Sequence, residues 1–426
     1  MDAAAPHADD ATVAAFRELL VRVGLAMSAA GDSVDSIDAS LRSMVAAYDI
    51  ERVEVAVLPT SLMAGTGQGR HSRVQIGVPE RAPLRFDQVA ELYALVGQLS
   101  TASIELASAA ARLDAIEGMA PTFRWPVRTL GHAVLTAGLA LLLQPAPGAV
   151  VAAFVLGLLV GVLKLSRMAG LELVFSVIVS FVVAVVVFVT LQHIAVDNPV
   201  RLLIPPLVTF LPGGALTIAT VELAAGQMVS GASRLVDGLV RLMLLSFGIL
   251  AASSLFDVSA RVLTDNPVAR LGPWAPWLGV VVFALGNYLH MSSPARSLPW
   301  IVIIMLAAYA GQVAGGAVFG GLLSGFFGAI VMTPLALWVE TLRSGPPKLI
   351  TFLPGFWLLV PGAAGLLGIT ELLGVNHQLG AEALADMLVT VMSIALGVLI
   401  GTAAYRAADS RVRGFGYRAP SGGAGT

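Results

Sequence analysis

The C-terminal two thirds of this chain contains an internal repeat. Residues 205–250 align without a gap on residues 354–399, at a constant shift of 149, and 15 of these 46 positions are identical. The identical pairs include prolines, glycines and acids: Pro205/Pro354, Pro212/Pro361, Gly213/Gly362, Glu222/Glu371, Leu223/Leu372, Asp237/Asp386, Met243/Met392 and Gly248/Gly397. Residues of these types, duplicated inside apolar spans, are typical of membrane transporters built from structural repeats.

Composition places these spans in a membrane, because 57% of the residues are hydrophobic and only 12% are charged. Lipid offers no partner to a free backbone N–H or C=O, so spans of about 20 residues must be helical. Divided at their Pro and Gly residues, the uncharged runs predict ten helices: 127–143, 148–163, 171–194, 202–222, 235–256, 276–291, 298–313, 319–339, 349–372 and 384–405.

The ten helices form two groups of five, about 149 residues apart. A unit with an odd number of helices enters the membrane from opposite sides in its two copies, so the copies are related by a pseudo-two-fold axis in the membrane plane. We therefore expect an α-helical polytopic membrane protein with two inverted five-helix repeats, at 123–257 and 270–408. A small soluble α+β domain at 1–122 precedes them, and a cytoplasmic tail occupies 409–426.

The basic residues predict the orientation, because cytoplasmic loops retain more Lys and Arg. If the first helix starts inside, 12 basic residues lie in cytoplasmic segments and three lie outside. The 12 are Arg124, Arg128, Lys164, Arg167, Arg234, Arg296, Arg343, Lys348, Arg406, Arg411, Arg413 and Arg418, and the three are Arg201, Arg261 and Arg270. We expect a multi-pass protein of the inner or plasma membrane with both termini cytoplasmic.

The first 122 residues change from a helical to a strand-like pattern. Apolar residues at helical spacing predict a helix from Val13 to about Gly31 and a second from Ser33 to Tyr48. Alternating residues at 52–58 and 71–78 predict strands on either side of a turn at 65–69, and two helices follow at about 86–98 and 100–117.

Two motifs in this region resemble catalytic ones. Gly31-Asp-Ser-Val34 resembles the nucleophile segment of a serine esterase, but it lies between two helices, whereas an esterase nucleophile follows a strand. Ser33 is better interpreted as a helix N-cap. The glycine-rich segment 65–70 lacks the Lys-Ser/Thr of a phosphate-binding loop, so a hairpin turn is the favoured interpretation.

Several classes of function receive no support from the sequence. Because the chain has no cysteine, disulfides and thiolate chemistry are excluded. A net charge of −2 and the absence of a basic cluster give no indication of a nucleic-acid partner. The acidic first residues do not form a secretory signal peptide. We expect no cofactor and no enzyme activity, and a homo-oligomer is an open possibility.

The repeated Pro-Gly pairs predict breaks in two membrane helices. Pro212-Gly213 lies near the middle of its span, where proline removes a hydrogen-bond donor and clashes with the preceding turn. The N–H groups of Gly213 and Gly214 can then receive a substrate carboxylate, and Pro361-Gly362 supplies the inverted counterpart. The alternative is a packing kink, since both residue types are common in membrane helices.

Acids at the membrane are costly, by about 3 kcal/mol on insertion scales, and persist where they are paired or functional. The sequence contains two repeated pairs, Glu222 with Glu371 and Asp237 with Asp386. We expect the two glutamates first, and then the aspartates, to carry protons. An interfacial cap is the alternative for the glutamates, and an i,i+4 ion pair with Arg241 is the alternative for Asp237.

Other polar residues in the spans are weaker candidates. Thr209, Thr217 and Thr220 surround the first break and can bond a substrate hydroxyl, although membrane threonines often bond the carbonyl four residues earlier. Asn287 and Gln192 are further polar candidates. His132, His193 and His290 are dispersed over three helices, which gives no metal site. Trp274, Trp277 and Trp300 are expected to anchor helix ends at the membrane interface.

These motifs together resemble the threonine/serine exporter family over nearly the whole chain. The resemblance rests on the helix, Gly31-Asp-Ser-Val34, helix and strand opening, on the ten spans in two fives, and on Leu211-Pro-Gly-Gly-Ala-Leu-Thr217 followed by Glu222-Leu, Gly226 and 230–235. The family implies export of small hydroxylated amino acids, L-threonine and L-serine, driven by the proton motive force. Val221-Glu222 departs from the basic residue and aspartate that are frequent in the family at this place.

Three alternatives to this function remain from the sequence. A transporter of another small metabolite, such as a dicarboxylate, fits the same fold. A membrane-anchored hydrolase or sensor acting through the N-terminal domain would need a His or an acid arranged around Ser33. A passive channel would have no need for duplicated membrane acids, and its flux would be insensitive to a proton gradient.

Overall fold

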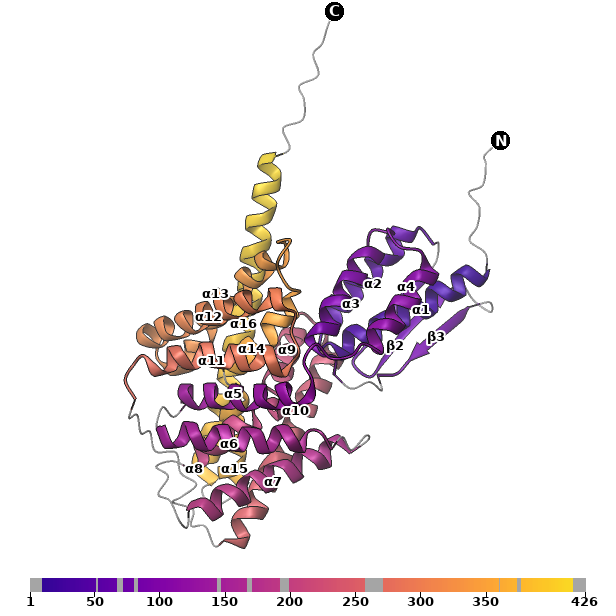
Figure 1. Ribbon diagram of the computed structural model, residues 1–426. Helices are drawn as coiled ribbons and strands as arrows, with labels where there is room; N and C mark the ends of the chain where they lie inside the picture. The colour runs from indigo at the N-terminus through magenta and orange to yellow at the C-terminus, as the bar shows by residue number, and fades with distance from the viewer. Residues whose placement is uncertain are drawn as a thin grey trace, which may run out of the picture.

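The computed structural model describes residues 10–50, 53–66, 72–79, 83–143, 147–166, 171–191, 199–256, 271–359, 361–373 and 377–416. They form an N-terminal unit of helices with one small sheet, followed by a bundle of helices that lies to one side of it (Figure 1). This architecture confirms the predicted class, a helical polytopic membrane protein with a small α+β unit at its start.

The N-terminal unit combines four helices with a three-stranded sheet among the described residues. The helices are α1 (Asp10–Ala29), α2 (Val34–Tyr48), α3 (Phe86–Leu99) and α4 (Leu106–Glu117). The strands β1 (Val53–Leu58), β2 (Ser61–Thr66) and β3 (Arg73–Gly77) pair antiparallel in the order β1-β2-β3. All four helices and the two outer strands were expected from the sequence pattern.

The central strand β2 was not expected, and the predicted turn at 65–69 is wrong at its start. Gly65 pairs with Glu54 of β1 and Val74 of β3, and Thr66 continues the strand, whereas residues 67–69 lie outside the described residues. Glycine has a weak intrinsic preference for strands, but ladder partners on both sides override it here.

The core of the N-terminal unit lies between α1 and the sheet. Phe16, Leu20, Val23 and Met27 of α1 are buried and lie on one helix face, and Leu62 of β2 belongs to the same cluster. Burial of such side chains contributes about 1.5–3 kcal/mol each, which gives the unit a core of its own.

The bundle contains every helix predicted after residue 123. They are α5 (Trp125–Leu143), α6 (Pro147–Leu163), α7 (Glu172–Leu191), α8 (Pro199–Leu207), the short η2 (Val208–Phe210), α9 (Gly213–Ala224), α10 (Met228–Leu255), α11 (Ala275–His290), η4 (Ala295–Ser297), α12 (Leu298–Phe319), α13 (Gly321–Glu340), α14 (Lys348–Leu359), α15 (Pro361–Leu373) and α16 (His377–Gly416). The predicted helices at 202–222 and 349–372 are each divided into two pieces.

The two halves repeat in structure as they do in sequence. Helices α7 and α13 differ by 149 at both ends, and α8 and α14 differ by 149 at their first residues. A Cβ atom on Gly248 would meet the carbonyl of Val177 and the amide of Phe181; one on Gly397 would meet the carbonyl of Phe326 and the amide of Ile330. Each contact is shifted by 149, so the fifth helix of each repeat crosses the third at the same glycine.

The repeats meet through their first helices and also through contacts between the fourth helix of one repeat and the fifth helix of the other. Helix α5 packs along α11, α9 packs on α16, and α10 packs on α15. The α5–α11 contact depends on small residues, since a Cβ atom on Gly138 would lie 2.3 Å from the backbone nitrogen of Phe283. Close backbone approach of this kind is the usual way in which membrane helices associate.

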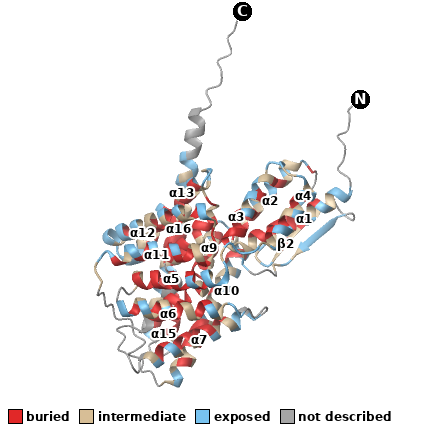
Figure 2. Cartoon of the chain, in the orientation of Figure 1, coloured by how far each residue is buried: buried red, intermediate tan, exposed pale blue. Residues whose placement is uncertain are grey.

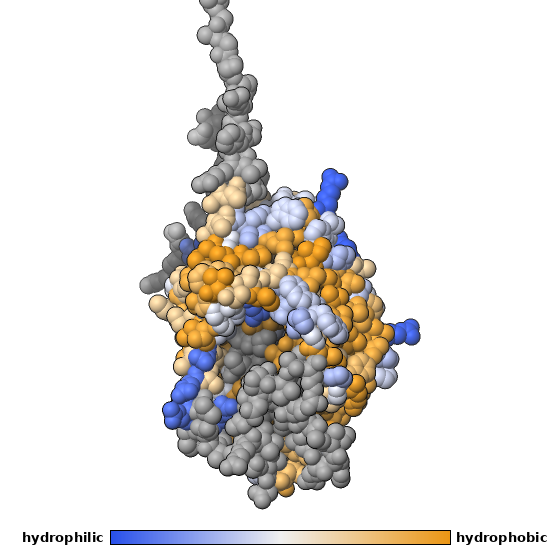
Figure 3. Space-filling view, turned by 90° about the vertical axis from the view of Figure 1, so that its left-hand side faces the viewer, coloured by the Kyte–Doolittle hydropathy of each residue, from blue (hydrophilic) through white to orange (hydrophobic). Residues whose placement is uncertain are grey.

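The bundle surface is suited to lipid. Six helices are long and apolar enough to cross a membrane, or seven if the bent pair 202–210 and 213–224 is one span; α6 and α14 are shorter apolar helices. These counts refer to the described part of the chain. Hydrophobic side chains cover much of the coloured part of the face shown in Figure 3, and buried residues concentrate in the interior of the bundle (Figure 2).

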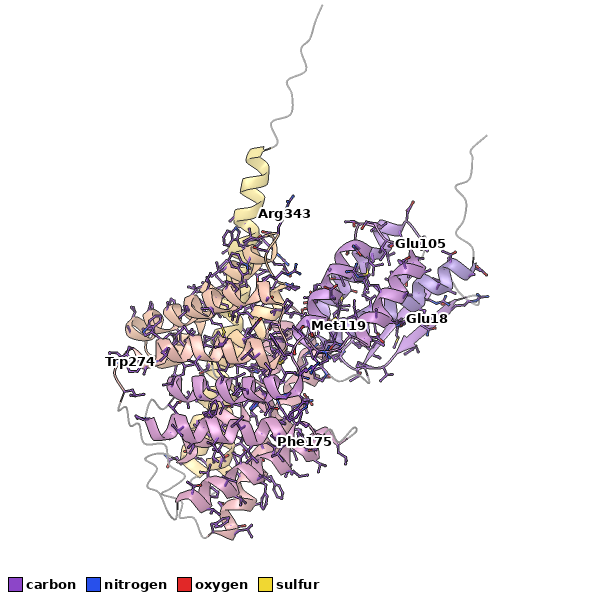
Figure 4. The ribbon with its side chains drawn as sticks, in the orientation of Figure 1. Glu18, Glu105, Met119, Phe175, Trp274 and Arg343 are labelled. Carbon is purple, nitrogen blue, oxygen red and sulfur yellow. The ribbon has the colours of Figure 1, made fainter. Side chains whose placement is uncertain are left out.

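The N-terminal unit contacts one end of the bundle. The amide of Phe86, the first residue of α3, donates to the carbonyl of Met291, which directly follows α11, at 3.0 Å. Figure 4 shows Met119 where the unit meets the bundle, and Trp274 at the opposite end of the bundle. Trp274 and Trp277 are exposed near the start of α11, and their role as interface anchors stays a prediction.

Candidate functional site

The first predicted break is present in the structure. Helix α8 contains Pro205 and Pro206, η2 tightens the chain at 208–210, and α9 begins directly after Pro212. The two helical pieces are bent by 59° relative to each other. Because three prolines within eight residues remove three backbone donors, the helix cannot continue through this segment.

The second break is also a discontinuity. Helix α14 ends at Leu359 and α15 begins at Pro361, while residue 360 lies outside the described residues. Pro361 and Gly362 form the first turn of α15, the position where proline is tolerated because its missing N–H has no partner there. The side chains of 361–364 are outside the described set.

A network of polar side chains lies beside the first break. The Nζ of Lys164, the residue after α6, donates to the hydroxyl of Thr209 at 2.6 Å and contacts the Nε2 of His290 at 3.3 Å. The Nε2 of His132 lies 3.2 Å from the same hydroxyl of Thr209. Lys164 also lies 5.0 Å from the ring centroid of Phe210, a cation–π contact. The break therefore meets α5, α6 and α11 at one polar cluster.

The expected dispersal of the histidines is wrong for His132 and His290. Their rings make an edge-to-face contact with centroids 4.8 Å apart, because α5 and α11 pack closely across the repeat boundary. His193 lies outside the described residues. No group of three or more His, Cys, Asp or Glu side chains able to hold a metal ion occurs in the described part of the chain.

Asn287 is buried one turn before His290 on α11. Neither atom of its amide has a hydrogen-bond partner among the described residues, and the same holds for the hydroxyls of Ser292, Ser293 and Ser297 just beyond the helix. Thr217 and Thr220 instead bond the carbonyls of Gly213 and Leu216, four residues earlier, each at 3.0 Å. The hydroxyls of these two threonines thus bond within their own helix, which was the alternative to a substrate contact. Gln192 lies outside the described residues.

Glu222 lies at the other end of α9, against the N-terminal unit. Its side chain is 0% exposed; Oε2 lies 3.1 Å from the Nε of Arg234, and Oε1 accepts from the backbone N–H of Val34 at 3.0 Å. Arg234 also donates to the carbonyl of Asp32 at 2.9 Å. A carboxylate at the first N–H of α2 is favourable for the helix dipole. We call Asp32, Val34, Glu222 and Arg234 the junction.

The loop before α2 is ordered by its own side chains. Ser33 is the N-cap of α2, and its hydroxyl accepts from the amide of Ser36 at 3.4 Å, as expected. Asp32 accepts from the hydroxyls of Ser36 and Tyr93. Burial and the neighbouring Asp32 raise the pKa of Tyr93, so its hydroxyl stays protonated and donates. Gln227 reaches Asp35 of α2 at 2.7 Å and extends the junction.

The remaining repeated acids differ in environment. Asp237 makes the i,i+4 ion pair with Arg241 at 2.8 Å, with side chains 48% and 40% exposed. Asp386 is exposed on α16, and its backbone carbonyl accepts from Thr390 at 2.8 Å. Glu371 is half-buried on α15. Arg234 has no counterpart in the second repeat, since residue 383 is alanine.

Sequence reasoning missed Lys164 and Arg234 as site residues. Lys164 entered the sequence analysis only for orientation, although it is one of two lysines in the chain. Arg234, 12 residues after Glu222, and Asp32 were part of the motifs that carry the family resemblance, but neither was predicted to contact Glu222 or its neighbours.

Paired repeats, a broken fourth helix and polar groups gathered at the break define a membrane transport protein. A family model described as "Putative threonine/serine exporter" matches residues 18–256. The chain belongs to this family of exporters.

Two relatives carry corresponding names. A threonine/serine exporter of Corynebacterium glutamicum is 20% identical over 424 residues, covering 92% of this chain and 83% of the relative. A probable threonine/serine exporter of Mycobacterium tuberculosis is 24% identical over 418 residues, covering 92% and 77%. A pheromone-regulated membrane protein 10 of Eremothecium gossypii is 27% identical over 140 residues, covering 32% and 18%. No solved structure matches the chain significantly.

Proposed function

We propose that this protein exports small hydroxylated amino acids, L-threonine and L-serine, out of the cell by alternating access between its two repeats. The observation that carries this proposal is the bent span at Pro212. This span belongs to the first repeat, contacts α14 and α16 of the second, and contributes Thr209 to the polar cluster. The family membership and the names of the two bacterial relatives support the substrate class.

The proposed substrate region surrounds the two breaks. It comprises Thr209, Pro212, Gly213, Gly214 and Thr217 in the first repeat, Pro361 and Gly362 in the second, and Asn287 on α11. Thr209 and Asn287 have the stronger support, because Thr209 belongs to the polar cluster and the buried amide of Asn287 has no partner in the part of the chain that the structure describes. For Thr217 the bond to Gly213 within its own helix competes with any substrate contact.

We further propose that export is coupled to protons through Glu222 and Glu371, with Asp237 and Asp386 as secondary candidates. In the described conformation Glu222 faces a cation and a backbone N–H, both of which favour its ionised form. Protonation removes this attraction and releases α9 from the N-terminal unit. The coupling step is therefore a change in the contact between Glu222 and Arg234.

The proposed orientation has both termini in the cytoplasm. It is supported by the side of the bundle on which the N-terminal unit lies, since the ends of α9 and α11 contact that unit and the basic residues Arg128 and Lys164 lie near them. Membrane lipid and the substrate are the proposed partners.

The test is efflux of labelled L-threonine from proteoliposomes, with and without an imposed pH gradient. Gradient-dependent efflux in the unaltered protein, lost in Glu222→Gln and Glu371→Gln, is expected. Glu382→Gln is the matched control, because Glu382 is exposed on α16, where its carboxylate accepts from the amide of Gln378. Absence of threonine and serine flux under every gradient would overturn the substrate assignment.

A further inference from the structure

The polar cluster at the first break contains a lysine, Lys164, that has no carboxylate partner among the described residues. Lys164 contacts a hydroxyl, an imidazole and an aromatic ring, all of them neutral groups. Arg128 donates to the carbonyl of His290 at 3.3 Å, which brings a second cation to the same place. Within the described part of the chain, no carboxylate lies at ion-pairing distance from Lys164. Burial and the neighbouring Arg128 lower the pKa of Lys164 to about 7, and an external anion beside the amine would restore its full charge.

The hydrogen bonds of the cluster fix the roles of both histidines. The Nδ1 of His290 lies 3.0 Å from the carbonyl of Arg128, and the Nδ1 of His132 lies 3.0 Å from the carbonyl of Gly157. A carbonyl only accepts, so each Nδ1 carries a proton and donates. The Nε2 of His290 faces the ammonium of Lys164, which only donates, so this Nε2 is an acceptor and His290 is neutral.

The same reasoning continues through Thr209. Its oxygen accepts from Lys164, so its own proton is free to donate to the Nε2 of His132 at 3.2 Å, which makes His132 neutral as well. All four ring nitrogens then have partners. The ammonium of Lys164 has three donors, of which two are used by described residues, so one remains for a ligand within the described part of the chain. The network thus orients a single cation and leaves it one open hydrogen-bond position.

Asn287 offers complementary groups close to that cation. It lies one turn before His290, so both side chains leave the same face of α11. Its amide is 0% exposed and neither of its polar atoms has a partner among the described residues. A buried, unpartnered amide costs free energy, and a ligand with donor groups relieves that cost. Its carbonyl oxygen can accept from an ammonium or a hydroxyl group.

One part of the cluster has no polar counterpart in the second repeat. The shift of 149 places Leu358 at the position of Thr209, so the hydroxyl that Lys164 contacts is absent from the inverted copy. The cluster lies at the end of α11 that contacts the N-terminal unit, so a ligand bound there is loaded from that side.

We propose that Lys164 binds the α-carboxylate of the exported amino acid and that Asn287 accepts from its amino or hydroxyl group, with His132, His290 and Thr209 holding the ammonium in position. This inference rests on the proposed function for the identity of the ligand. The chemistry it names is a small zwitterion with a free carboxylate.

The chain offers a direct probe, because Lys164 and Lys348 are its only lysines. In a Lys348→Arg background, the acetylation rate of Lys164 by an amine-reactive ester can be followed by peptide mass spectrometry. L-Threonine at ten times its dissociation constant is expected to slow modification about tenfold by mass action. L-Threoninamide, which lacks the carboxylate, is expected to give no protection at the same concentration. Equal protection by both compounds would overturn the assignment of the carboxylate to Lys164.

Transport supplies the second readout. Lys164→Met is expected to raise the KM for L-threonine efflux by about 10–100-fold, the range for loss of a charge-assisted hydrogen bond. Lys348→Met, which removes the other lysine, is expected to leave KM within about twofold. Equal elution of the variants on size exclusion verifies folding. Asn287→Ala tests the second contact and is expected to raise KM without changing the protection of Lys164 by acetate.

The outcomes separate this inference from the proposed function. Threonine efflux in the unaltered protein with an unchanged KM in Lys164→Met overturns the carboxylate site and leaves the function standing. Protection of Lys164 by a dicarboxylate, in a protein that moves neither threonine nor serine, supports the anion site and overturns the function. Absence of protection by every carboxylate overturns the site.

Discussion

The junction between Glu222 and Arg234 gives the sharpest prediction on the N-terminal unit. Arg234→Met removes the guanidinium, leaving Glu222 at 0% exposure with the backbone N–H of Val34 as its one remaining polar partner among the described residues. Breaking a buried ion pair by removing one partner costs about 3–5 kcal/mol. Since the side chain of Arg234 is 18% exposed, we take the lower end of this range, about 3 kcal/mol. This free energy corresponds to about a 100-fold change in the equilibrium constant for opening the contact between Glu222 and the N-terminal unit.

The assay is hydrogen–deuterium exchange of the peptide that contains residues 33–36. The amide of Val34 is the first N–H of α2, so its protection reports on the bond to Glu222 and on the contact between the unit and the bundle. Arg234→Met is expected to accelerate its exchange about 100-fold at most.

Arg241→Met is the matched control on the same helix. Arg241 pairs with Asp237 in an exposed i,i+4 geometry, which is worth about 0.3–0.5 kcal/mol and does not touch the N-terminal unit. The exchange rate of the Val34 amide in Arg241→Met is expected to equal the rate in the unaltered protein. If Arg234→Met and Arg241→Met gave the same rate at Val34, the reasoning about the junction would be refuted.

Three further predictions concern packing, capping and pH. Gly138→Leu is expected to give no monodisperse peak on size exclusion, because a Cβ atom at this position would lie 2.3 Å from the backbone nitrogen of Phe283. Gly148→Ala is the control and is expected to elute normally, because a Cβ atom there meets nothing within 4 Å. Ser33→Ala is expected to cost about 1 kcal/mol through loss of the N-cap, seen as faster exchange in the first turn of α2. The pKa of Tyr93 is raised, so its contribution to stability is present below pH ~10 and declines as the pH rises above that value; Tyr93→Phe should remove this alkaline decline in a thermal melt.

The helices could be predicted from the sequence because lipid leaves the chain few choices. Apolar spans of membrane length must be helical, and the repeat at a shift of 149 identified the broken fourth helix through Pro212 and its counterpart Pro361. The strand β2 was missed because its pairing depends on neighbours in space, not on its own residues.

The site was harder to predict than the helices. The environment of Glu222 depends on Val34, 188 positions earlier, and the contact of His132 with His290 depends on close packing of α5 against α11. Neither pairing leaves a local pattern in the sequence. The candidates Thr209 and Asn287 were identified because a polar residue in an apolar span is conspicuous, but their neighbours were not.

The crossing of the repeats at matched glycines has a consequence for how the protein can move. Gly248 lets α10 contact the backbone of α7, and Gly397 lets α16 contact the backbone of α13. Each of these two helix pairs is therefore closely packed and resists sliding of one helix along the other. Helix α9 packs on both α10 and α16, and α15 packs on both α16 and α10, so each short helix after a break contacts the long helices of both halves. A displacement of one helix pair relative to the other therefore has to break or shift contacts of both short helices, which makes the two halves of the molecule mechanically interdependent.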